Sequence, residues 1–307
     1  MDSQNNASTK MDVYQIVTDQ IISLLEKGVI PWQRPWTSGM PMNLLSKREY
    51  RGINLWLLVS MNYEQNFFLT WDQLKSIGGS VKKDEKGHVV LYWKPSQKKE
   101  EEEGNNRKVL AVLRYYKVFN ISQCREIPTN LLPQLELGIK EHQPHLKCED
   151  IINSMLGGPR IQHKEQKAYY NIKTDVINMP KKKSFKSIES YYSTLYHELV
   201  HSTGAEKRLG RKTITDMVPF GSESYAMEEL IAELGSAYLS HFSEILPNEI
   251  KDKVAYLQNW LEVLRNDKRF IVTSSGHAQK AVDFVLNKSG NGSKDEVNES
   301  LEESVVS

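Results

Sequence analysis

The segment His197-Glu198-Leu199-Val200-His201 places two histidines four residues apart, with a glutamate directly after the first. On a helix, residues i and i+4 lie on one face about one turn apart, so both imidazoles can bind one Zn²⁺ from the same side. Glu198 points about a quarter turn away. It can hold a water molecule on the metal but is too displaced to become a third ligand. This H-E-x-x-H pattern predicts a hydrolytic zinc centre.

The residues around this motif predict a helix from Ser187 to Thr203. The segment starts with a serine, has no internal Gly or Pro, and is followed by Gly204, a typical helix C-cap. At about 100° per residue, its apolar side chains form one stripe, which consists of Ile188, Tyr192, Leu195 and Leu199. His197 and His201 fall on roughly the opposite face. We therefore expect one side of the helix to pack on the domain and the other to face a cleft. A solvated polar face that matches the motif by chance is the alternative.

A catalytic zinc site needs three protein ligands and an open position, and a second predicted helix, Ser222 to Phe242, offers the third ligand. Glu229 and Glu233 lie opposite its apolar stripe, which consists of Met227, Ile231, Leu234, Tyr238 and Phe242. They are surrounded by small residues, which would allow another helix or a metal ion to come close to the two carboxylates. Glu228 is turned away from that pair and is the least expected of the three as a ligand.

The Glu-x-x-x-Glu spacing downstream of the histidines resembles the gluzincin arrangement of zinc peptidases. This resemblance implies Glu229 as the third ligand and Glu233 as the partner of the distal N–H of His197 or His201. The exchanged assignment stays open, and so does a surface role for each glutamate. An oxyanion donor cannot be chosen from the sequence; Tyr225 and Arg208 are candidates.

Bulk properties limit the class of protein. The chain has 307 residues, enough for two domains with a core each, and a formal net charge of +1. Cys124 and Cys148 do not make a disulfide framework, which suits a reducing compartment. The sequence has no apolar run of the roughly 18–20 residues that span a membrane, and its start lacks the features of a signal peptide. We therefore expect a soluble cytoplasmic protein with no membrane partner.

Composition along the chain predicts five segments. Residues 1–10 are polar and expected to be disordered, 11–124 form a first domain, 125–148 a linker, 149–287 a mainly helical second domain, and 288–307 a disordered acidic tail. Within the first domain we expect a helix over 13–27 and strands over 89–93 and 111–119, separated by a charged loop.

Tryptophans are concentrated in the first domain, where five of the six lie before residue 100 among many Lys and Arg residues. Aromatic rings beside cations suit single-stranded nucleic acid, because bases stack on rings while cations neutralise phosphates. A tryptophan-rich core covered by lysines fits the composition equally well. Trp71, at the start of a short predicted helix, is expected to be buried. The candidate DNA contacts are Trp32, Arg34, Trp36, Arg48, Tyr50, Arg51, Lys82 and Lys83.

An ordered series of blocks over residues 13–286 resembles the ArdC-type antirestriction proteins of conjugative plasmids and related mobile elements. The matching blocks are residues 31–36, 41–43, 50–54, 69–73, 116–124, 168–170, 174–180, 196–204, 208–211 and 220–234. The resemblance implies an α+β protein, in which a mixed α/β single-strand DNA-binding domain precedes a mainly helical, zincin-like (gluzincin) metallopeptidase domain. It also implies a role in protecting incoming DNA from host restriction.

If the site is active, we expect Zn²⁺, or another divalent ion such as Mn²⁺, on His197, His201 and Glu229, with Glu198 as the general base. The expected partners are single-stranded DNA and a protein or peptide substrate, for which a host restriction component is one option. Three alternatives remain open: a DNA-protecting protein with a purely structural metal, a metal nuclease, and a zinc knuckle formed by Cys124, His142, His145 and Cys148.

Overall fold

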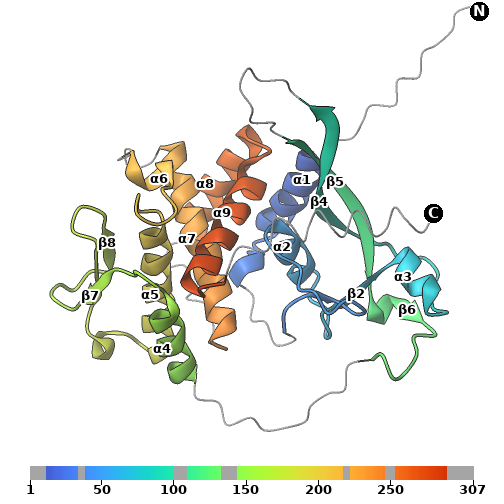
Figure 1. Cartoon of the computed structure of the whole chain (residues 1–307), viewed down its shortest axis with the longest axis horizontal. Coiled ribbons are helices and arrows are strands. Elements are labelled where there is room, and N and C mark those ends of the chain that lie inside the picture. The colour runs from blue at the N-terminus through green and yellow to red at the C-terminus, as the bar shows by residue number, and fades with distance from the viewer. Residues whose placement is uncertain are drawn as a thin grey trace, which may run out of the picture.

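The computed structural model describes residues 12–33, 39–99, 109–132, 144–216, 222–245 and 253–288. A mixed α/β N-terminal half is followed by a mainly helical C-terminal half, as predicted (Figure 1). The segments predicted to be disordered, 1–10 and all but the first residue of 288–307, lie outside the described residues.

The N-terminal half is built around a four-stranded sheet. Its strands are β1 (Met42–Asn43), β2 (Phe67–Thr70), β4 (His88–Lys99) and β5 (Val109–Asn120), in the order β1-β2-β5-β4. The first pair is parallel and the others are antiparallel. The helical segments here are α1 (Val13–Glu26), η1 (Pro31–Gln33), α2 (Ile53–Val59), α3 (Trp71–Ser76) and η2 (Ile121–Gln123), and a short pair, β3 (Ser80–Val81) and β6 (Cys124–Arg125), completes it.

The β4–β5 pair extends well beyond the predicted strands. Leu91 lies opposite Tyr115 and Trp93 opposite Leu113. Because side chains alternate between the two faces of a strand, these four residues share one face of the ribbon. Leu91 and Leu113 are buried against the helices, whereas Trp93 and Tyr115 are exposed. Each of these two cross-strand pairs therefore combines one buried aliphatic side chain with one exposed aromatic side chain.

The C-terminal half places a helical bundle beside a small sheet (Figure 1). The helical segments are α4 (Pro144–Ser154), η3 (Lys182–Ser184), α5 (Ile188–Thr203), α6 (Lys212–Thr215), α7 (Glu223–Phe242), α8 (Lys253–Asn266) and α9 (Phe270–Val285). The strands β7 (Arg160–Gln162), β8 (Tyr169–Asn171) and β9 (Val176–Asn178) form a sheet in the order β7-β9-β8. In the described part of the chain, no helix is long and apolar enough to cross a bilayer.

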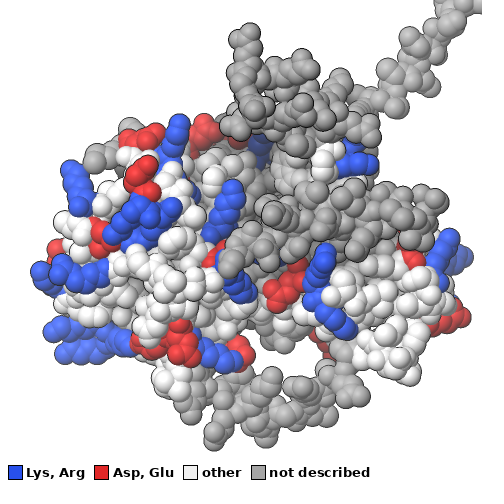
Figure 2. Space-filling view, in the orientation of Figure 1, with Lys and Arg blue, Asp and Glu red and all other residues white. Residues whose placement is uncertain are grey.

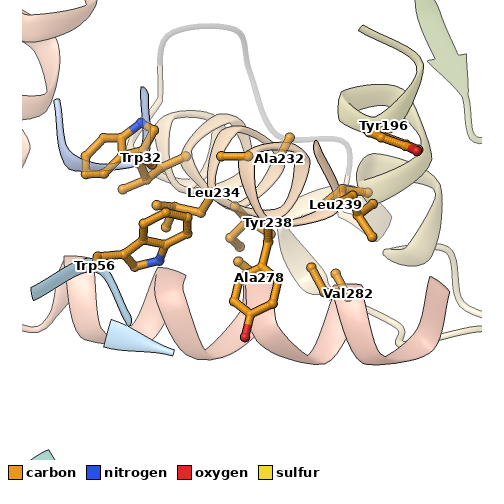
Figure 3. Packing of buried hydrophobic residues seen from close by; sticks show 14 of the residues in the cluster. Trp32, Trp56, Tyr196, Ala232, Leu234, Tyr238, Leu239, Ala278 and Val282 are labelled. Atoms are coloured by element: carbon orange, nitrogen blue, oxygen red, sulfur yellow. The ribbon is translucent and has the colours of Figure 1, made fainter. Parts of the chain in front are cut away.

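The largest apolar core joins the two halves of the chain. Trp32 lies with its ring centroid 6.4 Å from that of Trp56 and 5.2 Å from that of Trp260. Trp56 in turn meets Tyr238 of α7, with 6.2 Å between centroids (Figure 3). The sequence predicted a separate core for each domain. Smaller clusters do lie within the N-terminal half, but this main core uses helices from both ends of the chain.

Replacing Trp32 with alanine is expected to destabilise the whole protein. The side chain is 1 % exposed at the centre of the shared core, and removal of a buried Trp typically costs about 3–5 kcal/mol. Urea unfolding measures this loss. The matched control is Trp71→Ala, because Trp71 is 47 % exposed, and a change within about 0.5 kcal/mol is expected there. Equal effects of the two substitutions would contradict the placement of Trp32.

Candidate metal centre

Helix α5 carries the histidine motif, and its ends are those predicted. The Ser187 hydroxyl accepts a hydrogen bond from the Ser190 amide at the N-cap, and Gly204 follows at the C-cap. The helix is buried on more sides than a single apolar stripe would give. Tyr196 and Val200 are fully buried, whereas Ile188, predicted to lie in the stripe, is exposed in the first turn. Because neighbours surround α5, His201 is buried, whereas His197 is partly exposed.

Small residues on α7 allow it to lie close to α5. A Cβ added at Gly235 would lie 2.7 Å from the nearest Val200 methyl carbon, closer than real contacts allow. One residue further on, the Ser236 hydroxyl donates to the Ser193 carbonyl at 2.9 Å. This close approach, which the small residues of the sequence predicted, brings the α7 carboxylates to the histidines.

His197, His201 and Glu229 form the one group among the described residues whose ligand atoms could share a metal ion. The two Nε2 atoms are 3.1 Å apart, and each lies 3.6 Å from an oxygen of Glu229. Atoms bound to one Zn²⁺ at about 2.0–2.2 Å are separated by no more than about 4.4 Å. The three predicted ligands therefore fit a single divalent ion without rearrangement of the helices.

Carboxylates dominate the electrostatics of this group. Burial lowers the pKa of His197, but the hydrogen bond to Glu229 and the charges of Glu233 and Glu198 outweigh it and raise the pKa to about 9. Burial raises the pKa of Glu229, yet the two histidines and a hydrogen bond with Tyr225 bring it below its usual value. The carboxylates thus supply the negative charge that a cation bound between these helices would need.

Glu198 and Glu233 complete the predicted set. Glu198 is 8 % exposed and lies next to His197 on α5. The Oε1 atom of Glu233 lies 3.6 Å from Nδ1 of His197, on the side of the ring away from Glu229. That distance exceeds a normal hydrogen bond, but the carboxylate is in position to orient this imidazole.

Glu228 has a role that the sequence did not predict. Its Oε1 atom accepts from Nδ1 of His201 at 3.1 Å, while Nη2 and Nε of Arg211 donate to the same carboxylate at 2.6 and 3.0 Å. The Thr213 hydroxyl adds a further bond at 2.5 Å. Burial raises the pKa of Glu228, but His201 and Arg211 more than offset this and lower it to about 2. The side chain is turned away from Glu229 and Glu233, as predicted. It contacts Nδ1 of His201, the ring nitrogen that does not face Glu229.

The two candidate oxyanion donors lie in different places. Tyr225 hydrogen-bonds to Glu229 and so belongs to the metal group. Arg208 is instead a structural residue, contrary to the prediction. Its Nη atoms donate to both oxygens of Asp175 at 2.8 and 2.9 Å, and Nη1 also donates to the Ser202 carbonyl at 2.9 Å. With these donors already used, Arg208 ties the small sheet to the end of α5.

The alternative zinc knuckle gains no support from the described residues. Cys124 and Cys148 are both buried but belong to different apolar clusters, and His145 is exposed. His142 lies outside the described residues.

Metal affinity is expected to rise with pH. The pKa of His197 is about 9 without metal, so below that pH the ring is protonated and the ion must displace a proton. Because this folded-state pKa is raised, the apparent association constant should fall by about tenfold for each pH unit below 9. Competition with a chelator of known affinity at pH 6, 7 and 8 measures this dependence. A constant affinity over this range would contradict it.

The predicted DNA contacts are not all available to a ligand. Trp32 is in the core, and Tyr50 is 8 % exposed with its ring packed against Phe68, so neither can stack on a base. Nη2 of Arg51 donates to both carboxylate oxygens of Asp283. Of the other predicted contacts, Lys82 donates to the Ser122 carbonyl, and Arg48 and Lys83 are exposed. Arg34 and Trp36 lie outside the described residues.

Exposed aromatic side chains occur instead at positions outside the predicted set of DNA contacts. Trp71, expected to be buried, is 47 % exposed with Lys75 above its ring. On the β4–β5 ribbon, Trp93 and Tyr115 are 37 % and 40 % exposed. The two strands contain Lys and Arg but no Asp or Glu. The sequence alone could have indicated this surface as a candidate DNA contact, because the two strands combine aromatic and basic residues and lack acidic ones.

Two family descriptions match consecutive parts of the chain. Residues 11–119 match the N-terminal domain of the anti-restriction factor ArdC, and residues 147–277 match a zincin-like metallopeptidase. Crystal structures of the antirestriction protein ArdC from plasmid R388 are similar throughout. The metal-free structure has a TM-score of 0.72 at 34 % identity, covering 90 % of this chain and 97 % of that one. The Mn(II)-bound structure has a TM-score of 0.71 at 34 % identity, covering 92 % and 100 %.

Curated relatives include a short and a long protein. The uncharacterized protein y4eC of Sinorhizobium fredii (strain NBRC 101917 / NGR234) is 30 % identical over 314 residues, which cover 97 % of this chain and 99 % of that protein. A DNA primase TraC of Escherichia coli is 33 % identical over 297 residues, which cover 91 % of this chain but only 27 % of the primase. The chain therefore corresponds to about a quarter of that longer protein.

Proposed function

Because this chain belongs to the ArdC antirestriction family, we propose that it combines a metal-dependent peptidase site with single-stranded DNA binding and protects incoming DNA of a mobile element from host restriction. The proposal assigns DNA binding to residues 11–124 and peptide hydrolysis to 149–287. A cytoplasmic location, where entering DNA meets restriction enzymes, belongs to the same proposal.

The observation that supports the peptidase most directly is the position of Glu198 beside the His197, His201 and Glu229 group. Held by these three ligands, a divalent ion would acidify water and polarise a peptide carbonyl. Glu198 then accepts the proton of the attacking water and returns it to the leaving amine. Tyr225 holds Glu229, and Glu233 and Glu228 orient the two imidazoles from behind.

Zn²⁺ is the ion that we propose for this site. Two imidazoles and one carboxylate with an open fourth position are typical of catalytic zinc. The related protein from plasmid R388 has been crystallised with Mn(II), which makes Mn²⁺ the natural second ion to test.

The experiment that tests the peptidase is hydrolysis of an unfolded protein by the metal-loaded parent chain and by its Glu198→Gln variant. Tight metal binding without hydrolysis would favour the alternative, in which the metal is structural and the protein protects DNA by covering it. Release of labelled nucleotides from DNA would instead indicate a nuclease, which usually gathers more carboxylates than this site offers.

For DNA binding, we propose the exposed aromatic side chains of the β4–β5 ribbon as the site of base stacking. Trp93 and Tyr115 are diagonal neighbours on one face, with Lys117 further along the same strand. Lys94 and Arg114 lie on the reverse face and can reach phosphates from the side. One long relative of this chain is named a DNA primase, which agrees with a role on nucleic acid.

Replacing Trp93 with alanine is expected to weaken binding of an oligothymidine by about 1–3 kcal/mol, the usual contribution of one stacked base. Fluorescence anisotropy at fixed salt measures the change, and Tyr115→Ala should behave similarly. The matched control is Trp71→Ala, which removes a tryptophan of α3 that is more exposed than Trp93 and should leave affinity unchanged. A larger loss in the control than in Trp93→Ala would place the interface elsewhere.

A further inference from the structure

Two lysine-rich loops are held together at one end of the β7-β9-β8 sheet. Asn178, the last residue of β9, accepts hydrogen bonds from the amides of Lys164 and Glu165 at 3.1 and 3.2 Å. Its side-chain amide donates to the carbonyls of Glu165 and Lys167 at 3.1 and 2.6 Å. The loop after β7 is therefore folded around the point where β9 ends and the second loop begins.

The second loop, residues 179–187, is anchored to the first and to α5. Nδ1 of His163 lies 3.1 Å from the Met179 carbonyl. Tyr191, in the first turn of α5, packs against both loops, with its ring centroid 6.2 Å from that of His163 and 5.4 Å from that of Phe185. These contacts fix the two loops side by side at the N-terminal end of the metal helix.

Five lysines of these loops form what we call the basic end: Lys164, Lys167, Lys181, Lys183 and Lys186. All five are exposed, and none has a carboxylate of the described residues within ion-pair distance. Lys182, by contrast, is bound to Glu149 and Tyr192. The one carboxylate in the loops, Glu165, accepts from the Tyr169 hydroxyl. Figure 2 shows Lys and Arg side chains gathered on the side of the molecule where Figure 1 places β7.

We propose that the basic end is a second contact for the phosphate backbone of single-stranded DNA, in addition to the β4–β5 ribbon. This inference rests on the proposed DNA binding of the chain. Unpaired ammonium groups on a fixed backbone neutralise phosphates and release counterions, without reading the sequence. No Trp, Tyr or Phe in these loops is fully exposed, so the basic end holds the backbone and leaves the bases unstacked.

The position of the basic end connects DNA with the metal centre. His197 lies ten residues beyond Ser187 on α5, which corresponds to about 15 Å along a helix. Ser187, the last residue of the second loop, therefore lies about 15 Å from His197 along the helix axis. A strand held at the basic end would bring proteins bound to it to the helix that carries the peptidase site, which would select substrates by their association with DNA.

The test is the salt dependence of binding to an oligothymidine by the full chain and by a Lys181→Gln, Lys183→Gln, Lys186→Gln triple variant. Loss of three phosphate contacts on a single strand should reduce the slope of log affinity against log salt by about 2. If the two lines converge near 1 M salt, the triple variant binds about a hundredfold more weakly at 0.1 M.

A second triple variant controls for overall charge. Lys147→Gln, Arg265→Gln and Lys268→Gln remove the same total charge from exposed cations that already pair with Glu244, Glu26 and Asp12. Its salt slope should match that of the parent chain. An equal loss of slope in both triple variants would assign the effect to net charge and overturn the inference.

Failure of the inference is distinguishable from failure of the proposed DNA binding. A parent chain that does not bind the oligonucleotide removes the proposed function itself. A parent that binds, with an unchanged slope in the Lys181, Lys183 and Lys186 triple variant, removes the basic end alone. Protection of these three lysines from acetylation by the oligonucleotide, compared with Lys147 and Lys268, tests the same contact without any substitution. Reduced binding of polyglutamate with intact DNA binding would assign an acidic protein partner and overturn the proposal.

Discussion

A Glu198→Gln variant is expected to keep its metal and to hydrolyse peptide bonds about 10²–10⁴ times more slowly than the parent chain, because it lacks the general base. Gln has nearly the same shape as Glu but cannot accept the proton of the attacking water. His197, His201 and Glu229 are unchanged, so the ion has the same three ligands. The rate should fall while the metal content, measured by elemental analysis, stays the same.

The matched control is Glu189→Gln, which makes the same substitution in the first turn of α5, away from the ligands. It should retain the rate of the parent chain. Equal turnover in the parent and the Glu198→Gln variant would remove the peptidase assignment. Loss of metal from the variant would show that Glu198 contributes to metal binding. We do not expect this, because Glu198 points away from the helix face that His197 and His201 share.

The metal helix was predictable to its ends because its signals are local. Ser187 supplies the N-cap, Gly204 follows the last turn, and the spacing of His197 and His201 fixes their common face. Glu229 and Glu233 stood out because both lie opposite the apolar stripe of their helix, and the resemblance to the gluzincin arrangement implied Glu229 as the ligand. Such features depend on residues within a few turns of one another, and the sequence displays them directly.

The parts of the site that could not be predicted come from segments far apart in the chain. Glu228 contacts His201 only because α7 lies close to α5, and its charge is balanced by Arg211 from the loop before α6. The residues next to Trp32 in the sequence do not distinguish a buried tryptophan from one that stacks on a base. Its burial depends on Trp260 in α8, which no pattern near residue 32 indicates.

The shared core also affects how the two proposed activities can be separated. Trp32 and Trp56 of the N-terminal half cover Trp260 and Tyr238 of the C-terminal half, and Arg51 pairs with Asp283 of α9. A chain that begins after residue 124 would expose these apolar surfaces. Point substitutions on the β4–β5 ribbon and at Glu198 are therefore the sharper way to remove one activity and keep the other.

An Arg211→Met variant is expected to lose about 3–5 kcal/mol of unfolding free energy, the usual effect of removing one partner from a buried ion pair. Arg211 and Glu228 have side chains only 3 % and 4 % exposed, so water cannot replace the guanidinium. Arg211 also donates to the Val200 carbonyl and the Thr203 hydroxyl, which hold the last turn of α5. Because Glu228 positions His201, metal affinity should fall about 10- to 100-fold as well.

A Glu228→Gln change in the same chain separates the two roles of Arg211. With both charges removed, no unpaired carboxylate is buried, and the double variant should regain much of the lost stability. The side-chain carbonyl of the introduced glutamine can still accept from Nδ1 of His201, so metal affinity should recover in parallel, as chelator competition would show. If Arg211 only stabilised the loop before α6, the second substitution would restore neither quantity. Recovery of both would identify the Arg211 and Glu228 pair as the device that fixes His201 for the metal.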